Sequence, residues 1–186
     1  MNNLFQILLT ATKETINNVD LSHNIDKVDS SFLEYYTAPA GSEHYRLLSY
    51  MSSLINGSTF LDIGTYRGYS AIALSQNQNN KVVSYDIGKF HTQKSGGNVE
   101  YRIGNAIEFE HFHGVSVILL DTVHDGIFED EFINHLRSIG WSGVLIMDDI
   151  HHFPKLNVVY NELTEVKHDI TSIGHWSGTG AVLFGV

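Results

Sequence analysis

The 186-residue chain contains no cysteine and only two prolines, Pro39 and Pro154. Without cysteine, neither a disulfide nor a thiolate site can form. This composition fits a reducing compartment, and we expect a cytoplasmic protein. No uninterrupted apolar run reaches the roughly 20 residues needed to span a bilayer, so we expect no membrane association. Low-complexity linkers are also missing, which indicates one domain over residues 1–186.

Basic residues are few, because 11 Lys and Arg stand against 21 Asp and Glu, and the formal net charge is −10. A chain this acidic repels a phosphate backbone, so we expect no nucleic-acid partner. The hydrophobic content of 42% is typical of a globular protein. The glycine fingerprint G-x-G-x-x-G of dinucleotide-binding proteins is missing, which argues against a nicotinamide-dependent oxidoreductase.

Apolar runs rich in β-branched residues predict parallel strands at 58–63, 81–87, 99–103, 115–121 and 143–148. Helical candidates lie between several of them, most clearly at 68–77 and 126–139. The segments after the second and third runs are short, so any helix there should be a turn or two. Two further strands, 167–173 and 179–185, have no helix between them and must pair antiparallel.

These patterns predict an α/β fold with a doubly wound, mostly parallel, seven-stranded Rossmann-like sheet and a C-terminal antiparallel hairpin. Residues 1–57 read as mostly helical, with a break at 37–41, and should form an N-terminal cap. The cap would cover a cofactor-binding core over residues 58–186.

The most informative stretch is Phe60–Ser70, where an apolar run reaches Asp62 and is followed by Gly64, Gly68 and a helical segment. Glycine permits a tight turn and a close ligand approach, and a helix N-terminus offers free N–H groups. The glycine pair alone fits a helix-packing turn equally well. Asp86 ends the second apolar run, where an acidic residue can accept ribose hydroxyls.

The string Asp-Ile-Gly-Thr-Tyr-Arg-Gly-Tyr-Ser resembles motif I of class I S-adenosylmethionine (SAM) methyltransferases, in particular the catechol and caffeoyl-CoA O-methyltransferases. The resemblance implies that SAM is the cofactor. Its methionine carboxylate would lie on the turn and Ser70, its ribose on Asp86 and its adenine along Gly104-Asn-Ala. The cofactor-binding residues would then be Asp62, Gly64, Thr65, Tyr66, Gly68, Ser70, Asp86, Asn105, Ala106 and Asp121.

Three carboxylates follow the fourth and fifth apolar runs, namely Asp121, Asp148 and Asp149. Neighbouring parallel strands would bring them to one rim, where they repel each other unless a positive group lies among them. Hard oxygen donors suit Mg²⁺, or another divalent cation such as Ca²⁺ or Mn²⁺. Either residue of the Asp148–Asp149 pair, taken alone, could instead cap a helix.

After the fifth strand, catechol-type enzymes have Asp-Asn, whereas this chain has Asp148-Asp149, with Asp149 in place of the Asn. The acidic pair resembles the macrocin and mycinamicin sugar O-methyltransferases, which also carry a histidine three positions after the first Asp. His124 matches that histidine, and the resemblance implies that it is the general base. A neutral imidazole can take a proton from a hydroxyl group. His151 and His152, directly after Asp149, could approach the metal but are expected at the substrate entrance or on the surface, and no role in the site is assigned to His175.

The sequence therefore predicts a SAM-dependent, divalent-metal-dependent O-methyltransferase acting on a small hydroxylated substrate, such as a sugar, a diol or a catechol-like molecule. One alternative is a SAM- or nucleotide-binding module without catalysis. The nicotinamide-dependent oxidoreductase remains a less favoured alternative. The sequence does not identify the substrate. It also leaves the oligomeric state open, with a homo-oligomer as one alternative.

Overall fold

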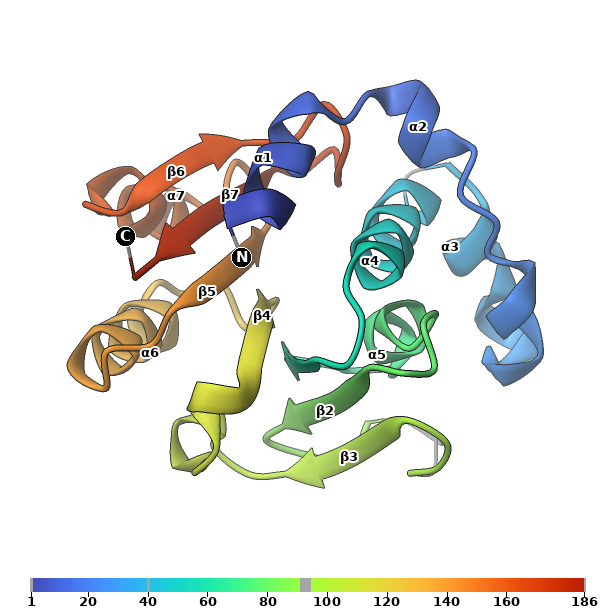
Figure 1. Cartoon of the computed structure of the whole chain (residues 1–186), viewed down its shortest axis with the longest axis horizontal. Helices are drawn as coiled ribbons and strands as arrows, with labels where there is room; N and C mark the ends of the chain where they lie inside the picture. The colour runs from blue at the N-terminus through green and yellow to red at the C-terminus, as the bar shows by residue number, and fades with distance from the viewer. Residues whose placement is uncertain (1, 40, 91–94, 186) are drawn as a thin grey trace.

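The computed structural model describes residues 2–39, 41–90 and 95–185. Its centre is a seven-stranded sheet with the strand order β3-β2-β1-β4-β5-β7-β6 (Figure 1). The strands are β1 Thr59–Ile63, β2 Lys81–Asp86, β3 Val99–Ile103, β4 Val115–Leu120, β5 Gly143–Asp148, β6 Val166–Asp169 and β7 Thr179–Phe184.

The strand directions agree with the predicted doubly wound topology. Strands β3, β2, β1, β4 and β5 pair in parallel, whereas β7 pairs antiparallel with both β5 and β6. Strand β6 is shorter than the predicted segment 167–173. The chain turns at Ile170, whose carbonyl accepts hydrogen bonds from the N–H groups of Ile173 and Gly174. The predicted antiparallel hairpin is therefore confirmed, with an earlier end to its first strand.

Helices cover both faces of the sheet. One face carries α1 Asn2–Thr10, α2 Lys13–Asn17, α3 Leu33–Thr37, α4 Ser42–Leu54 and α5 Tyr69–Leu74, and the other carries α6 Ile127–Ser138 and α7 Pro154–Glu162. Side chains alternate along each strand, so that Phe60 packs under the first group of helices and Leu61 under the second. This double burial explains why the strands read as nearly continuous apolar runs.

The predicted helices are recovered with two differences. Helix α5 ends at Leu74, short of residue 77, because the Asn77 and Asn80 side chains turn back and donate to the carbonyl of Ile55 at 2.7 and 3.0 Å. Helix α7 was not among the segments that the sequence marked most clearly. Pro154 stands at its first turn, where a missing N–H has no consequence and the fixed φ favours a helix.

The N-terminal residues are mostly helical, as expected, and the break falls between the end of α3 at Thr37 and the start of α4 at Ser42. Two short 3₁₀ segments, η1 Ser22–Lys27 and η2 Ser30–Phe32, lie between α2 and α3. Helix α4 is tied to α5 by hydrogen bonds from Ser49 Oγ to Ala73 O and from Ser52 Oγ to Leu74 O, at 3.2 and 2.6 Å. This contact places the start of α4 beside the carboxyl ends of the central strands.

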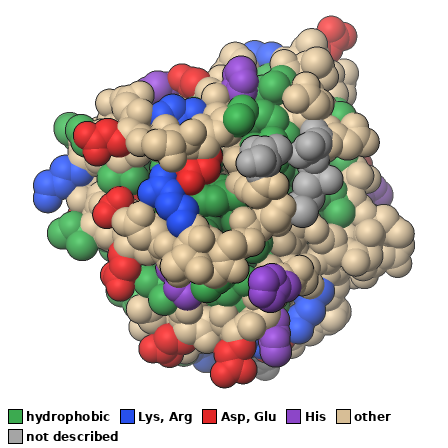
Figure 2. Space-filling view, turned by 60° about the vertical axis from the view of Figure 1, so that its left-hand side comes forward, with side chains coloured by type: hydrophobic (Ala, Val, Ile, Leu, Met, Phe, Trp, Pro, Cys, Tyr) green, Lys and Arg blue, Asp and Glu red, His purple; other side chains and the backbone are tan. Residues whose placement is uncertain are grey.

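The connection after β3 contains only short helical turns, as the sequence predicted, whereas residues 91–94 of the connection after β2 lie outside the described part of the chain. Only two 3₁₀ turns, η3 Ala106–Glu108 and η4 Phe112–Gly114, link β3 to β4. Figure 2 shows one face of the molecule, on which acidic, basic and histidine side chains alternate with apolar ones. In the parts of the chain that the structure describes, no helix combines the length and the apolar character needed to cross a bilayer.

Candidate active site

The turn after β1 approaches the end of β4 very closely at Gly64. Gly64 has φ +89°, and a Cβ atom built there would lie 1.7 Å from the carbonyl oxygen of Asp121. Its N–H donates to the Tyr85 carbonyl on β2 at 2.9 Å. Gly68, with φ +82°, begins α5. Glycine is therefore required at position 64 for both the backbone conformation and the space.

Asp62 lies behind this turn and is completely buried. Its Oδ2 accepts a hydrogen bond from Ser84 Oγ at 2.7 Å, whereas its Oδ1 and the nearby Thr65 Oγ1 are buried without a hydrogen-bond partner. Burial raises the pKa of Asp62 to about 6, although the hydrogen bond from Ser84 partly offsets the effect. Unpartnered buried polar atoms beside a glycine turn fit a ligand that supplies hydrogen-bonding groups.

A cavity of about 630 Å³ opens at the carboxyl ends of β1 to β4 and has mainly apolar walls. Asp86, at the end of β2, lines it and accepts a hydrogen bond from the Tyr66 N–H at 2.9 Å. Asn105 and Ala106 line the same cavity, and the Asn105 side chain accepts from the Ile107 N–H at 3.0 Å. The strand ends that the sequence assigned to ribose and adenine thus meet in one space.

An adjoining cavity of about 450 Å³ lies between the turn, α4 and the end of β5. Both cavities are lined by Gly64, Tyr66 and Asp121, so they meet at the glycine turn. The walls of the 450 Å³ cavity are rich in aromatic side chains, namely Phe32, Tyr35, Tyr45 and Tyr69, so we call it the aromatic cavity and the larger one the apolar cavity. Thr65 and Ser70 also line it, whereas Asp62 and Gly68 support the turn from behind and line neither cavity.

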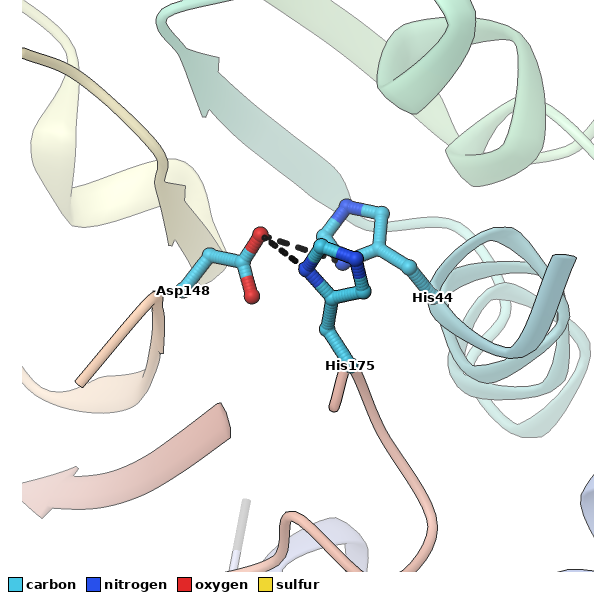
Figure 3. Close-up of side chains that lie close together, drawn as sticks. All are labelled: His44, Asp148 and His175. Atoms are coloured by element: carbon cyan, nitrogen blue, oxygen red, sulfur yellow. Dashed lines mark ion pairs between the residues drawn. The ribbon is translucent and has the colours of Figure 1, made fainter. Parts of the chain in front are cut away.

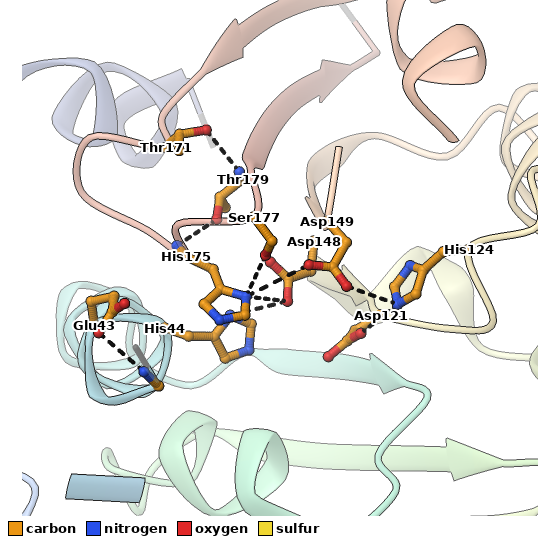
Figure 4. Close-up of polar contacts among 11 residues, drawn as sticks. Glu43, His44, Asp121, His124, Asp148, Asp149, Thr171, His175, Ser177 and Thr179 are labelled. Carbon is orange, nitrogen blue, oxygen red and sulfur yellow. Dashed lines mark hydrogen bonds and ion pairs between the residues drawn. The ribbon is translucent and has the colours of Figure 1, made fainter. Parts of the chain in front are cut away.

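Two of the predicted carboxylates, Asp121 and Asp148, line the second cavity, and Asp149 and His124 lie next to them; we call this group the His–Asp rim (Figure 4). His124 Nε2 lies 3.3 Å from Asp121 Oδ1 and 3.3 Å from Asp149 Oδ2. Burial alone would lower the pKa of His124, but the hydrogen bond to Asp121 and the charges of Asp121 and Asp149 raise it. For Asp149, burial would raise the pKa, and hydrogen bonds from His175 and Ser177 with two histidine charges lower it to about 2. The imidazole nitrogen thus lies within contact distance of two of the three carboxylates.

Asp148 pairs with His44 and with His175, and His175 also pairs with Asp149. His44 Nδ1 and His175 Nδ1 lie 3.5 and 3.4 Å from Asp148 Oδ2 (Figure 3). His44 comes from α4 in the N-terminal cap, and His175 from the connection between β6 and β7. The structure therefore places His175 in the rim itself, while His151 and His152 are exposed, as expected.

Two residues of the site were missed by the sequence reasoning. His44 carries no local signal, because its position depends on how α4 packs over the sheet. Glu129 stands in the first turn of α6, where acidic residues are common, but its buried carboxylate accepts hydrogen bonds from the N–H groups of His124 and Gly126, both at 2.9 Å, and from Thr122 Oγ1 at 2.6 Å. Glu129 thus fixes the loop that presents His124.

Backbone strain is concentrated at this site. In the described part of the chain, the non-glycine residues with positive φ are Tyr66, His124 and Asp149, at +42°, +58° and +60°. Each occupies a turn directly after a strand of the site. Such conformations cost on the order of 1–3 kcal/mol and persist where the surrounding structure enforces them, often at functional sites.

The buried Asp62 should impose a pH dependence on the unliganded protein. Its pKa is raised in the folded state, so the folded form keeps its proton up to about pH 6 while the unfolded chain loses it near 3.8. The free energy of unfolding should therefore fall as the pH rises between these values. Asp62→Asn should abolish this component and be more stable at pH 7 by up to about 3 kcal/mol. Urea unfolding of both proteins at pH 4 and pH 7 measures it; an equal change in both would show that Asp62 does not contribute.

Comparison with known proteins identifies the fold through solved structures, but not through sequence. No protein-family model matches the sequence, and no similar sequence was found among curated proteins. Among solved structures, an O-methyltransferase from Bacillus cereus in complex with S-adenosylhomocysteine (SAH) has a TM-score of 0.60 at 15% identity, covering 95% of this chain and 99% of that one. The SAH-bound methyltransferase PaMTH1 from Podospora anserina has a TM-score of 0.56 at 14% identity, with 88% and 93% covered.

The N-methyltransferase NodS from Bradyrhizobium japonicum, in complex with S-adenosylhomocysteine, is also similar, with a TM-score of 0.53 at 13% identity, covering 87% of this chain and 96% of that one. Neighbours described as O- and N-methyltransferases thus share one architecture, so the fold alone does not identify the acceptor atom. The chain has the fold of SAM-dependent methyltransferases.

Proposed function

We propose that this protein binds SAM and transfers its methyl group to a hydroxyl group of a small molecule. The observation that carries the proposal is the meeting of two cavities at the glycine turn, with Asp86 and Asn105 in one and the His–Asp rim in the other. The adenosine part of SAM would occupy the apolar cavity. The acceptor would lie in the aromatic cavity, separated from the adenosine part of SAM by Gly64 and Asp121.

The residues present fit SAM on structural grounds. Thr65 lines the aromatic cavity and its Oγ1 is buried without a partner, and the Gly64 turn leaves no room for a side chain. The Thr65–Ser70 turn and the start of α5 would receive the methionine carboxylate. Asp86 would accept the ribose hydroxyls, and Asn105 with Ala106 would lie along the adenine.

In the aromatic cavity the chain's own groups have distinct tasks. SAM, when bound, supplies an electrophilic methyl group on a sulfonium. The aromatic walls would hold a flat ring or a sugar face, exclude water and fix the acceptor oxygen near the turn, which is where positioning contributes most to the rate. His124 Nε2 would take the hydroxyl proton, since it lies on the rim between Asp121 and Asp149.

The rim also fits a divalent cation, as the sequence suggested for Asp121, Asp148 and Asp149. Asp148 Oδ1 is buried without a hydrogen-bond partner, and an anionic oxygen in that position favours a positive ligand. A cation held there would orient the acceptor oxygen and stabilise its negative charge. The aromatic cavity suits a sugar, a diol or a catechol-like acceptor.

The proposal is tested by incubating the purified protein with SAM and a panel of sugars, diols and catechols, and measuring S-adenosylhomocysteine and methylated product by mass spectrometry. Acceptor-dependent product supports it. Binding of SAM without turnover on any hydroxylated acceptor would favour the non-catalytic module. A thermal shift with NAD but none with SAM would favour an oxidoreductase.

Asp86→Asn should weaken SAM binding without unfolding the protein. The amide oxygen can still accept from the Tyr66 N–H, but the charge-assisted acceptor for the ribose is lost. We expect a loss of roughly 1.5–3 kcal/mol, or about 10- to 100-fold in Kd, by calorimetry. Asp130→Asn, an exposed carboxylate on α6, is the control and should bind normally. Equal affinity of the two variants would mean that the ribose is held elsewhere.

A further inference from the structure

We propose that His44, Asp148 and His175 form a binding site for a divalent transition-metal ion, of the kind represented by Zn²⁺, in preference to Mg²⁺. The inference deepens the proposed function by naming the class of ion at the rim. It depends on that function only for what the ion does to a substrate, because the site itself is inferred from its donors.

The geometry of the three side chains suits a single ion. One donor atom from each lies within 4.8 Å of the others. Asp148 Oδ2 is 3.5 Å from His44 Nδ1 and 3.4 Å from His175 Nδ1. Two donors bound about 2.1 Å from one tetrahedral ion are roughly 3.4 Å apart, so these distances leave room for an ion between them. Figure 3 shows the two imidazoles approaching the carboxylate from separate segments of the chain.

Burial shields two of the three donors from solvent. His44 is 6% exposed and Asp148 is 4% exposed. His44 Nδ1 has Asp148 Oδ2 as its partner at 3.5 Å, whereas Asp148 Oδ1 is buried without a hydrogen bond. A buried carboxylate oxygen is costly to keep in the folded protein without a partner. Binding one ion to this cluster would engage both the imidazole and the carboxylate.

The donor types determine which ion fits. Two imidazoles and one carboxylate suit Zn²⁺ and Fe²⁺, and such a set leaves coordination positions open. Mg²⁺ prefers an octahedron of oxygens and keeps several waters. All three side chains line the aromatic cavity together with Asp121 and Ser70, so open positions would face the proposed acceptor.

The all-oxygen set predicted from the sequence is less accessible to an ion than the cluster of His44, Asp148 and His175. Asp121 and Asp149 both contact His124 Nε2 at 3.3 Å, so an ion bound to both would have to displace that imidazole. The main rival is a network without metal, in which His175 Nδ1 bonds Ser177 Oγ at 2.7 Å and pairs with Asp149 Oδ1 at 3.7 Å. That network predicts no specific metal binding.

The experiment uses the full chain after removal of metals by a chelator. Calorimetry with Zn²⁺ and with Mg²⁺ should show one Zn²⁺ per chain, bound more tightly than Mg²⁺. Co²⁺ should give the intense visible absorption of a four- or five-coordinate site. Zn²⁺ should also raise the melting temperature, because the site joins α4, β5 and the β6–β7 connection.

His44→Ala and His175→Ala should each weaken Zn²⁺ binding by more than the roughly 10- to 100-fold typical of losing an outer-shell partner, and should abolish the Co²⁺ band. His44→Gln keeps the bulk of the side chain and should behave in the same way, which separates ligation from packing. His23→Ala removes an exposed histidine whose side chain is 70% exposed and is the matched control. Circular dichroism establishes that each variant is folded.

Zn²⁺ binding that is unchanged in the folded His44 and His175 variants, or a preference for Mg²⁺, would overturn the inference. SAM binding is measured on the same metal-free samples to separate the two proposals. SAM binding without a Zn²⁺ site would refute only this inference. A Zn²⁺ site without SAM binding would leave this inference intact and count against the proposed function.

Discussion

Turnover of the His124→Asn variant should fall about 10²- to 10⁴-fold at neutral pH, because the group proposed to accept the hydroxyl proton is lost. Asparagine is the substitution of choice, since His124 has φ +58° and Asn tolerates this left-handed conformation better than most non-glycine residues. The variant therefore removes the imidazole with little change to the backbone. Initial rates at saturating SAM and acceptor give the effect directly.

Two further measurements separate a base from a structural residue. The affinity for SAM should stay unchanged in His124→Asn, because His124 lines neither cavity that holds the cofactor residues. Added imidazole should restore part of the turnover, since it can enter the space left by the ring. Near-normal turnover without imidazole would show that His124 only balances the charges of Asp121 and Asp149.

Gly64→Ala should reduce SAM binding below detection. Its Cβ would lie 1.7 Å from the Asp121 carbonyl oxygen, so the ends of β1 and β4 would have to separate and the turn would lose its shape. Gly57→Ala is a matched control, because Gly57 also has positive φ, at +71°, but its Cβ would meet nothing within 4 Å. Gly57→Ala should cost only the backbone strain of about 1–2 kcal/mol and bind SAM normally.

Calorimetry with SAM and thermal unfolding of both glycine variants give the comparison. A Gly64→Ala protein that is destabilised and fails to bind SAM, beside a Gly57→Ala protein that binds, supports the turn as the cofactor cradle. If the two variants bind SAM equally well, the cradle lies elsewhere, and the resemblance of residues 62–70 to a SAM motif is not functional.

The sheet could be predicted from the sequence because its strands are buried on both faces. Phe60 and Leu61 point to opposite layers, and both must be apolar, so the strand appears as a continuous run. The convergence of Asp121 with the Asp148–Asp149 pair was also predictable. Strands β4 and β5 are parallel neighbours, and their carboxyl ends necessarily share one edge of the sheet.

The histidine half of the rim could not be predicted in the same way. His44 reaches Asp148 through the packing of α4 on α5, which no local pattern records. His175 lies in an irregular connection whose path is set by hydrogen bonds such as that from its N–H to Thr179 Oγ1 at 2.8 Å. Glu129 looked like an ordinary first-turn acid, because only the folded loop reveals that its carboxylate is buried. Tertiary packing therefore determines which histidine and acidic side chains form the site, whereas hydrophobic periodicity in the sequence determines the sheet.

The central claim is that this protein binds SAM on the Gly64 turn, and calorimetric titration of the wild-type protein with SAM and with S-adenosylhomocysteine tests it most directly. The account predicts saturable binding of one ligand per chain, weakened by Asp86→Asn and lost in Gly64→Ala. No binding heat and no thermal shift with either ligand, from a folded wild-type protein, would contradict it.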